Sequence, residues 1–274
     1  GTRFNSSTLP IALSYNPRKV HNFLNMINII KKEFQAKGSF NHGEIIENKP
    51  IGFPQDGGDT QPYSNLFYWA HAWTSGKSST IGLHPHQGFE ICSFVLKGFI
   101  NHFDTKLNSW IRLEEGDVQI IRSGKGISHS EEIGENSEIF QIWFDPDISK
   151  TLHNDATYDD YKLSDFPMTE IGNYKKKIIK GFGSPIKLFS EKININEYIF
   201  SNGIYEHKLD LDLVSSMFIL EGEALFNESL ISKGDFVIIE NEELIKIKST
   251  ENIKVFEITS PKKPTYPTYF QRFG

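Results

Sequence analysis

The sequence has a single cysteine, no long apolar run and no block of like charge, and each absence excludes a class of protein. Cys92 alone cannot form an intrachain disulfide, which fits a reducing compartment. The longest apolar run is five residues, Leu66 to Ala70, whereas a membrane span needs ~20. The net charge is −6, with 29 basic against 35 acidic residues, and gives no support for nucleic-acid binding. We therefore expect a soluble, cytoplasmic protein that binds neither nucleic acid nor membranes.

The length of the chain bears on what a bound metal would do. With 274 residues the chain can form one large domain or two small ones, and roughly three quarters of its unfolded surface can be buried. Such a core needs neither a metal nor a disulfide to fold. A metal site in this sequence is therefore expected to serve function rather than folding.

Residues 1–40 contain one helical pattern. Pro17 stands at a favoured first helical position, after Asn16 as a possible N-cap, and Gly38 would end the helix. The apolar residues between them that keep helical spacing are Val20, Phe23, Leu24, Ile27 and Phe34. We expect residues 1–40 to form an N-terminal extension with an amphipathic helix, which packs on the surface, contacts a second copy or covers a site.

Beyond residue 40 the pattern changes to short runs rich in β-branched and aromatic residues, broken every ~8 to 12 residues by Gly, Asn, Asp or Pro. This spacing is typical of antiparallel sandwiches and barrels. Residues 94–98 match 218–222 at an offset of 124, and residues 115–118 match 233–236 at an offset of 118. We predict an all-β fold with two antiparallel β-barrels, at residues 41–160 and 168–274; chance similarity between hairpins is the alternative.

The first predicted barrel contains two pairs of metal-ligating residues. His84 and His86 flank Pro85, and a spacing of two puts both imidazoles on the same face of a strand. His129 and Glu131 repeat that spacing, so two strands can direct four ligands towards one ion. Three imidazoles and one carboxylate suit a divalent transition metal. We predict one site for a divalent transition metal here.

The second barrel serves as an internal comparison. The offset of 124 carries the first histidine pair onto Lys208 and Asp210, and the offset of 118 carries the second pair onto Ile247 and Ser249. His207 lies one position out of register and would point to the opposite face of its strand. We therefore predict that the second barrel has no metal ligands, is structural, and leaves one ion per chain.

At these motifs the sequence resembles the pirin family, bicupins of the cupin superfamily. The resemblance rests on residues 84–90, 113–119 and 123–131, and extends more weakly to residues 101–104 and 141–143. Together these motifs cover about residues 63–150, and the second barrel matches only the general cupin pattern. The resemblance implies two cupin barrels in one chain.

The resemblance also implies a metal, usually iron, held by His84, His86, His129 and Glu131, so we expect Fe(II), with Ni, Co, Mn, Cu and Zn as alternatives. Some pirins have quercetin 2,3-dioxygenase activity, which implies an iron-dependent dioxygenase acting with dioxygen on a flavonol or a similar enolic or phenolic compound. Glu131 would then be a catalytic residue, as ligand and as acceptor of the substrate's hydroxyl proton. The alternative is a non-enzymatic metal- or redox-responsive protein that modulates a partner protein, as other pirins are thought to do.

Two departures from the family motifs concern charge. Gln87 stands where the family usually has Arg, and Phe103 replaces an Arg after His102. These changes put in doubt any contact with an anionic ligand or partner that depends on those arginines, and leave the four metal positions intact. Rings near the motifs either sandwich a flat substrate or belong to the core: Trp69, Trp73, Phe89 and Phe103.

Overall fold

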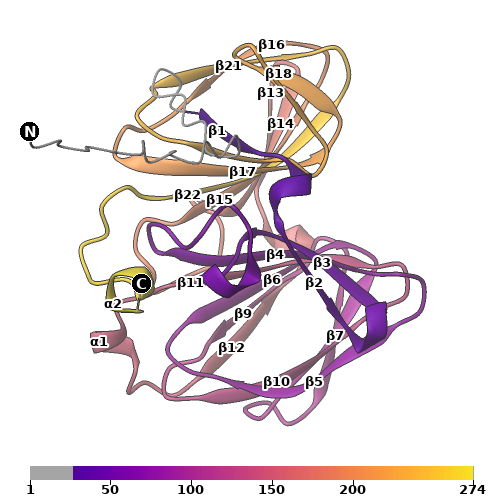
Figure 1. Cartoon of the computed structure of the whole chain (residues 1–274), viewed down its shortest axis with the longest axis vertical. Coiled ribbons are helices and arrows are strands. Elements are labelled where there is room, and N and C mark those ends of the chain that lie inside the picture. The colour runs from indigo at the N-terminus through magenta and orange to yellow at the C-terminus, as the bar shows by residue number, and fades with distance from the viewer. Residues whose placement is uncertain (1–26, 274) are drawn as a thin grey trace, which may run out of the picture.

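The structure is a computed structural model that describes residues 27–273, and these residues consist mostly of antiparallel strands (Figure 1). Two units lie one above the other along the long axis, each with a seven-stranded and a four-stranded sheet. The seven-stranded sheets face each other in the middle, and the four-stranded sheets lie at the outer ends. The all-β prediction is confirmed. Neither α-helix in residues 27–273 has the length and apolar character needed to cross a membrane.

The first unit contains the strands between residues 36 and 161. In spatial order its seven-stranded sheet is β12 (Thr157–Tyr161), β9 (Val118–Arg122), β6 (Glu90–Lys97), β11 (Glu138–Phe144), β4 (Leu66–Thr74), β3 (Ile45–Ile51) and β2 (Ala36–Phe40). Its four-stranded sheet is β5 (Ser79–His86), β10 (Ile127–Ile133), β7 (Phe99–Asp104) and β8 (Trp110–Glu114). The shorter sheet carries the two strands with the predicted metal ligands.

The second unit repeats this arrangement. Its seven-stranded sheet is β1 (Ile27–Ile30), β20 (Phe236–Ile239), β17 (Leu213–Glu221), β22 (Ile253–Pro261), β15 (Asn194–Phe200), β14 (Tyr174–Lys180) and β13 (Met168–Ile171). Its four-stranded sheet is β16 (Gly203–Lys208), β21 (Leu244–Ser249), β18 (Glu223–Phe226) and β19 (Ser229–Ser232). The described helices are all short: α1 (Ile148–Thr151), α2 (Tyr269–Phe273), and the 3-10 turns η2 (Lys32–Phe34), η3 (Asn41–Gly43), η4 (Pro54–Asp56) and η5 (Leu163–Asp165).

The predicted N-terminal helix is wrong wherever the structure describes it; residues 17–26 lie outside the described residues. Residues 27–30 form β1, which pairs with β20 of the second unit, and residues 36–40 form β2, which pairs with β3 of the first. Three of the four residues of β1 are isoleucines, whose β-branched side chains favour strands, and Ile30 is buried in the core between the units. Strand pairing and this burial outweigh a weak helical spacing. The predicted domain boundaries stay a prediction.

The repeated motifs of the sequence occupy equivalent turns in the two units. Gly98 joins β6 to β7, and Gly222 joins β17 to β18. Both have positive φ, at 75° and 81°. A Cβ at Gly98 would collide with Ser137, and one at Gly222 with the carbonyl of Asn252, so only glycine fits either turn.

A shared aromatic core holds the two units together. Trp69 on β4 is fully buried, and its ring centroid lies 5.4 Å from Phe140 of the same unit. It also lies 5.0 Å from Phe236 and 5.6 Å from Phe256 of the second unit, both edge-on. Side chains from both seven-stranded sheets therefore form one continuous core, which leaves the interior of the first unit, between its two sheets, for the candidate site.

Candidate metal centre

Two paired strands bring three histidines together in the first unit. On β5, His84 and His86 are two residues apart and share a face. β10 pairs antiparallel with β5, so that His129 lies directly opposite His84 and Ile127 opposite His86. The ring centroids are 4.4 Å apart for His84 and His129, 4.8 Å for His86 and His129, and 4.9 Å for His84 and His86. Each ring offers a nitrogen within 4.8 Å of the other two, as one metal ion requires.

Glu131, the fourth predicted ligand, lies close to only part of this cluster. A β-bulge shifts the register between His129 and Glu131, so that Glu131 pairs with Ile81. Its carboxylate forms a second ligand group with His102 and His129, again within 4.8 Å, and its Oε1 lies 3.4 Å from Nδ1 of His129. The four predicted residues are thus divided between two overlapping groups that share His129, and the more buried group contains Glu131 together with His102.

His102 is the residue that the sequence argument did not place at the site. It pairs with Glu131 across β7 and β10 and is fully buried. Its Nε2 lies 2.6 Å from Oδ2 of Asp104, and the other oxygen of Asp104 accepts hydrogen bonds from the backbone amides of Lys106 and Leu107. Tyr158 stacks on the ring with centroids 4.6 Å apart. The available signal was the spacing of two between His102 and Asp104, which puts both on the inner face of a strand.

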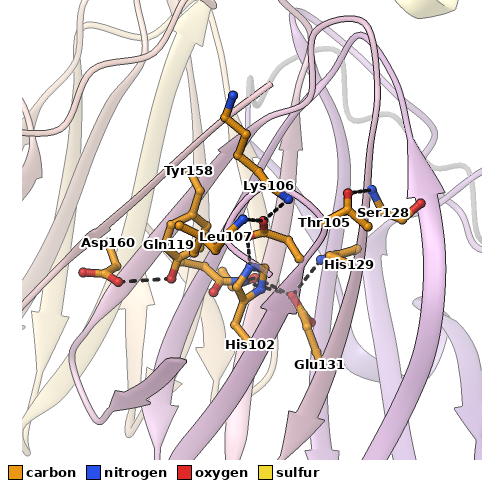
Figure 2. A network of polar contacts seen from close by, with 12 residues as sticks. His102, Thr105, Lys106, Leu107, Gln119, Ser128, His129, Glu131, Tyr158 and Asp160 are labelled. Atoms are coloured by element: carbon orange, nitrogen blue, oxygen red, sulfur yellow. Dashed lines mark hydrogen bonds and ion pairs between the residues drawn. The ribbon is translucent and has the colours of Figure 1, made fainter. Parts of the chain in front are cut away.

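Side-chain amides hold the Glu131 carboxylate in place. Gln119 donates from Nε2 to Oε1 over 3.0 Å, and Ser93 donates to the same oxygen over 3.5 Å. Gln141 donates from Nε2 to Oε2 over 3.0 Å, while its own Oε1 accepts from the indole of Trp143 over 3.2 Å. Figure 2 shows Gln119, His129 and His102 converging on this carboxylate. The orientation of Glu131 is therefore fixed from both sides.

Two ionisable groups of the cluster are, at neutral pH, in the protonation states that bind a metal. Burial opposes ionisation of Glu131, but the hydrogen bond from His129 and the charges of His129, His102 and His84 outweigh it and lower the pKa of Glu131 to about 2. Burial, with the neighbouring charges of His129 and His84, lowers the pKa of His86 to about 3. At neutral pH the site therefore holds an ionised carboxylate beside a neutral imidazole, and both are forms that bind a metal.

Unpaired nitrogens provide a test of whether a metal fits. Within residues 27–273, buried ring nitrogens without a well-formed hydrogen bond are Nε2 of His86, Nδ1 of His102 and both nitrogens of His129, of which Nδ1 has only its 3.4 Å contact with Glu131. His84 uses Nδ1 to donate to the carbonyl of Gly82 over 2.7 Å, which leaves the lone pair of its Nε2 for a ligand. Unpaired polar atoms are costly in a protein interior. A divalent transition metal would bind one nitrogen of each imidazole, so the residues present fit one.

The cluster opens into a cavity of about 400 Å³ inside the first unit. His84, His86 and Glu131 lie on its wall. The rest of the lining is Phe40, Ile45, Glu47, Lys49, Phe53, Tyr68, Ala70, Ala72, Ile81, Gly82, Ile133, Ile139, Gln141 and Trp143. Most of these side chains are apolar, and the volume lies in the range of small-molecule sites.

The cavity wall described by the structure does not include the four rings that were candidates for a substrate sandwich: Trp69, Trp73, Phe89 and Phe103. Trp69 belongs to the core between the units, and Phe103 packs against Trp110. The cavity takes its rings from residues that the sequence argument did not single out: Phe40, Phe53, Tyr68 and Trp143.

The second unit has a different interior at the equivalent place. The sequence offset of 124 predicted that Lys208 would face inward, but Lys208 is exposed and His207 faces inward, so the offset is wrong by one residue on this strand. Nε2 of His207 lies 2.8 Å from Oε2 of the buried Glu257. On β21 the inward positions include Ile247 and Ser249. Within residues 27–273, both groups of three side chains that could hold a metal lie in the first unit.

Comparison with known proteins agrees with this geometry. The pirin family model matches residues 58–144. A pirin-like protein from Arabidopsis thaliana is 34% identical over 99 residues, which are 36% of this chain and 30% of that protein. A quercetin 2,3-dioxygenase from Escherichia coli is 38% identical over 69 residues, which are 24% of this chain and 29% of that protein.

Solved structures extend the likeness to the whole fold. A bacterial pirin from Escherichia coli, solved in complex with nickel(II), is superimposed with a TM-score of 0.71 at 19% identity, over 86% of this chain and 100% of that one. In sequence, the chain spans about half the length, or less, of the curated relatives it matches. The family match and these relatives show that residues 58–144 are similar to pirins, and the solved structures show that the fold is shared.

Proposed function

We propose that this protein is an iron-dependent dioxygenase of the quercetin 2,3-dioxygenase type, acting on a flavonol or a similar enolic or phenolic compound. The observation that carries the proposal is the position of the histidine cluster on the wall of a largely apolar cavity, where a flat ligand can approach it. A relative that bears the name quercetin 2,3-dioxygenase supports the reaction type.

The residues that would hold the metal are His84, His86, His129 and Glu131, with His102 beside them. When bound, ferrous iron supplies Lewis acidity towards an enolic or phenolic oxygen and one-electron chemistry with dioxygen. The Gly82 carbonyl and the Asp104 carboxylate each orient one imidazole by accepting a hydrogen bond from one ring N–H, so the other ring nitrogen keeps its lone pair.

Glu131 has a second role in the proposal, as an acceptor for the substrate. With a pKa of about 2 it is ionised at neutral pH, and it lies on the cavity wall. A substrate hydroxyl that donates to this carboxylate is held with its oxygen next to the histidines. Ile81, Ile133 and Ile139 exclude water around that hydroxyl and so strengthen the hydrogen bond.

Oxygen consumption tests the proposal. Iron-loaded protein is expected to consume oxygen with a flavonol such as quercetin, and Glu131→Gln is expected to lose at least about a hundredfold in rate while it still binds iron. The matched control is Glu132→Gln, on the same strand, where Glu132 accepts from Asn101 and does not line the cavity. Absence of oxygen uptake with every flavonol tried would refute the proposal.

A further inference from the structure

The wall of the cavity on β3 carries a charged group that the metal centre does not use. Glu47 and Lys49 are two residues apart on β3, share a face with Ile45, and line the cavity. Glu47 is 5% exposed, and its Oε1 lies 3.3 Å from the Lys49 ammonium. The same ammonium lies 3.3 Å from Oδ1 of Asp56. A buried carboxylate at the far wall of a binding cavity needs a functional explanation.

The chain makes room for this carboxylate. Gly38 of β2 is the direct strand partner of Glu47, and a Cβ at Gly38 would collide with Oε1 of Glu47. Lys49 in turn lies over the ring of Tyr68, 5.8 Å from its centroid, which holds the ammonium against β4. The position of Glu47 is thus built by its neighbours on both sides.

The hydrogen bonding of Glu47 is incomplete. Oε1 is paired with Lys49, whereas Oε2 has neither a hydrogen bond nor an ion pair within residues 27–273. Burial raises the pKa of Glu47, and Lys49 only partly opposes this. Two carboxylates, Glu47 and Asp56, share one ammonium, so the group as a whole carries a net negative charge. It favours a hydrogen-bond donor at this end of the cavity and repels an anion.

The sheet register gives the span between the two polar ends. Gln141, which binds the Glu131 carboxylate, pairs with Ala70 on β4, and Glu47 pairs with Ala72 on the same strand. Two strand spacings of ~4.8 Å and two residues of ~3.4 Å separate the Cα atoms of Gln141 and Glu47 by about 12 Å. Alanine side chains form the floor between them, which leaves room for a flat ring system of that length.

We propose that Glu47, positioned by Lys49, is a specificity-determining residue that accepts a hydrogen bond from a hydroxyl group on the distal ring of a flavonol-type ligand whose proximal oxygen lies at the histidines. Because the group of Glu47, Lys49 and Asp56 is negative overall, it favours a ligand with a neutral hydrogen-bond donor on the distal ring over a ligand with a carboxylate there. This inference rests on the proposed function of the same cavity and names the substrate feature that the cavity recognises.

Binding of matched flavonols tests the inference without turnover. Kaempferol and galangin differ only by the para-hydroxyl of the distal ring, and their dissociation constants can be measured by isothermal titration calorimetry on the full chain loaded with Ni(II), without oxygen. The wild type is expected to bind kaempferol roughly tenfold more tightly than galangin, the effect of one charge-assisted hydrogen bond. A para-carboxylate analogue of galangin is expected to bind more weakly than galangin itself.

Variants of β3 assign the preference to one residue. In Glu47→Ala the ratio of the dissociation constants of galangin and kaempferol is expected to fall to about one. Glu47→Gln keeps an acceptor oxygen without the charge, so its ratio should lie between those of the wild type and Glu47→Ala. Asn48→Ala, on the opposite face of the same strand, is the control and should keep the wild-type ratio. Circular dichroism of each variant confirms that it is folded before the titration.

The outcomes separate this inference from the proposed function. Equal wild-type affinities for the two flavonols, or an unchanged ratio in Glu47→Ala, would overturn the role of Glu47 and leave the dioxygenase proposal standing. The expected ratio without oxygen uptake by the iron-loaded protein would support the role of Glu47 and refute the dioxygenase. Failure of the wild type to bind either flavonol would overturn both.

Discussion

The amide of Gln119 provides a sharp test of how the carboxylate of Glu131 is held. Gln119 is fully buried and donates to Oε1 of Glu131 over 3.0 Å, while its own Oε1 has no hydrogen-bond partner among residues 27–273. A hydrogen bond to a charged group contributes about 1.5–3 kcal/mol, so Gln119→Leu should lower the free energy of unfolding of the apo protein by up to that amount at neutral pH. Loss of the unpaired Oε1 offsets part of this cost.

The larger effect should be on metal binding. A residue that orients a metal ligand typically contributes 10- to 100-fold in affinity, so we expect Gln119→Leu to weaken Ni(II) binding by about that factor. The assay is calorimetric titration in competition with a chelator. Gln87→Leu is the control, because Gln87 follows His86 directly and is exposed. Wild-type affinity in Gln119→Leu would refute the account of how Glu131 is oriented.

Three further predictions concern stability. Burial raises the pKa of Asp145 from 3.8 to about 6, so the folded chain binds this proton more tightly than the unfolded chain does. The free energy of unfolding should therefore fall by up to about 3 kcal/mol as the pH rises from about 4 to 7, and thermal melts of Asp145→Asn should lose that dependence. Trp69→Ala removes the ring that joins the units and should lower the free energy of unfolding, measured in urea, by about 3–5 kcal/mol. Trp69→Phe should lower it less, because it keeps a ring and removes an indole nitrogen that is buried without a hydrogen bond within residues 27–273. His84→Ala should remain cooperatively folded by circular dichroism, because the core does not need the metal; an unfolded variant would show that the ion is structural.

The histidine cluster could be predicted because strand geometry is local. A spacing of two puts His84 and His86 on one face whatever the rest of the chain does, and the same rule applies to His129. The strand register then places His129 opposite His84. The position of Glu131 was less predictable, because the bulge beside it depends on the pairing of β10 with β5 and turns the carboxylate towards His102.

Other features depend on contacts between distant segments, which a spacing rule does not contain. Residues 27–30 fit a helical spacing, but they form a strand because they pair with the edge of β20. His207 faces inward because 15 positions separate it from Gly222, one more than the 14 that separate His84 from Gly98 and that the offset of 124 assumes. Glu47 lines the same cavity as the metal ligands only because β2, β3 and β4 extend the sheet across it, so its role was not visible in the sequence.

Metal stoichiometry tests the central claim most directly, since the account places one metal ion in the first unit of each chain. Titration of the apo protein with Fe(II) under anaerobic conditions, or elemental analysis of the loaded protein, should give one ion per chain. The double variant His129→Ala and Glu131→Ala should give none, because it removes the residue shared by both ligand groups together with the carboxylate. Two ions of comparable affinity per chain, or one ion retained by the double variant, would contradict the account.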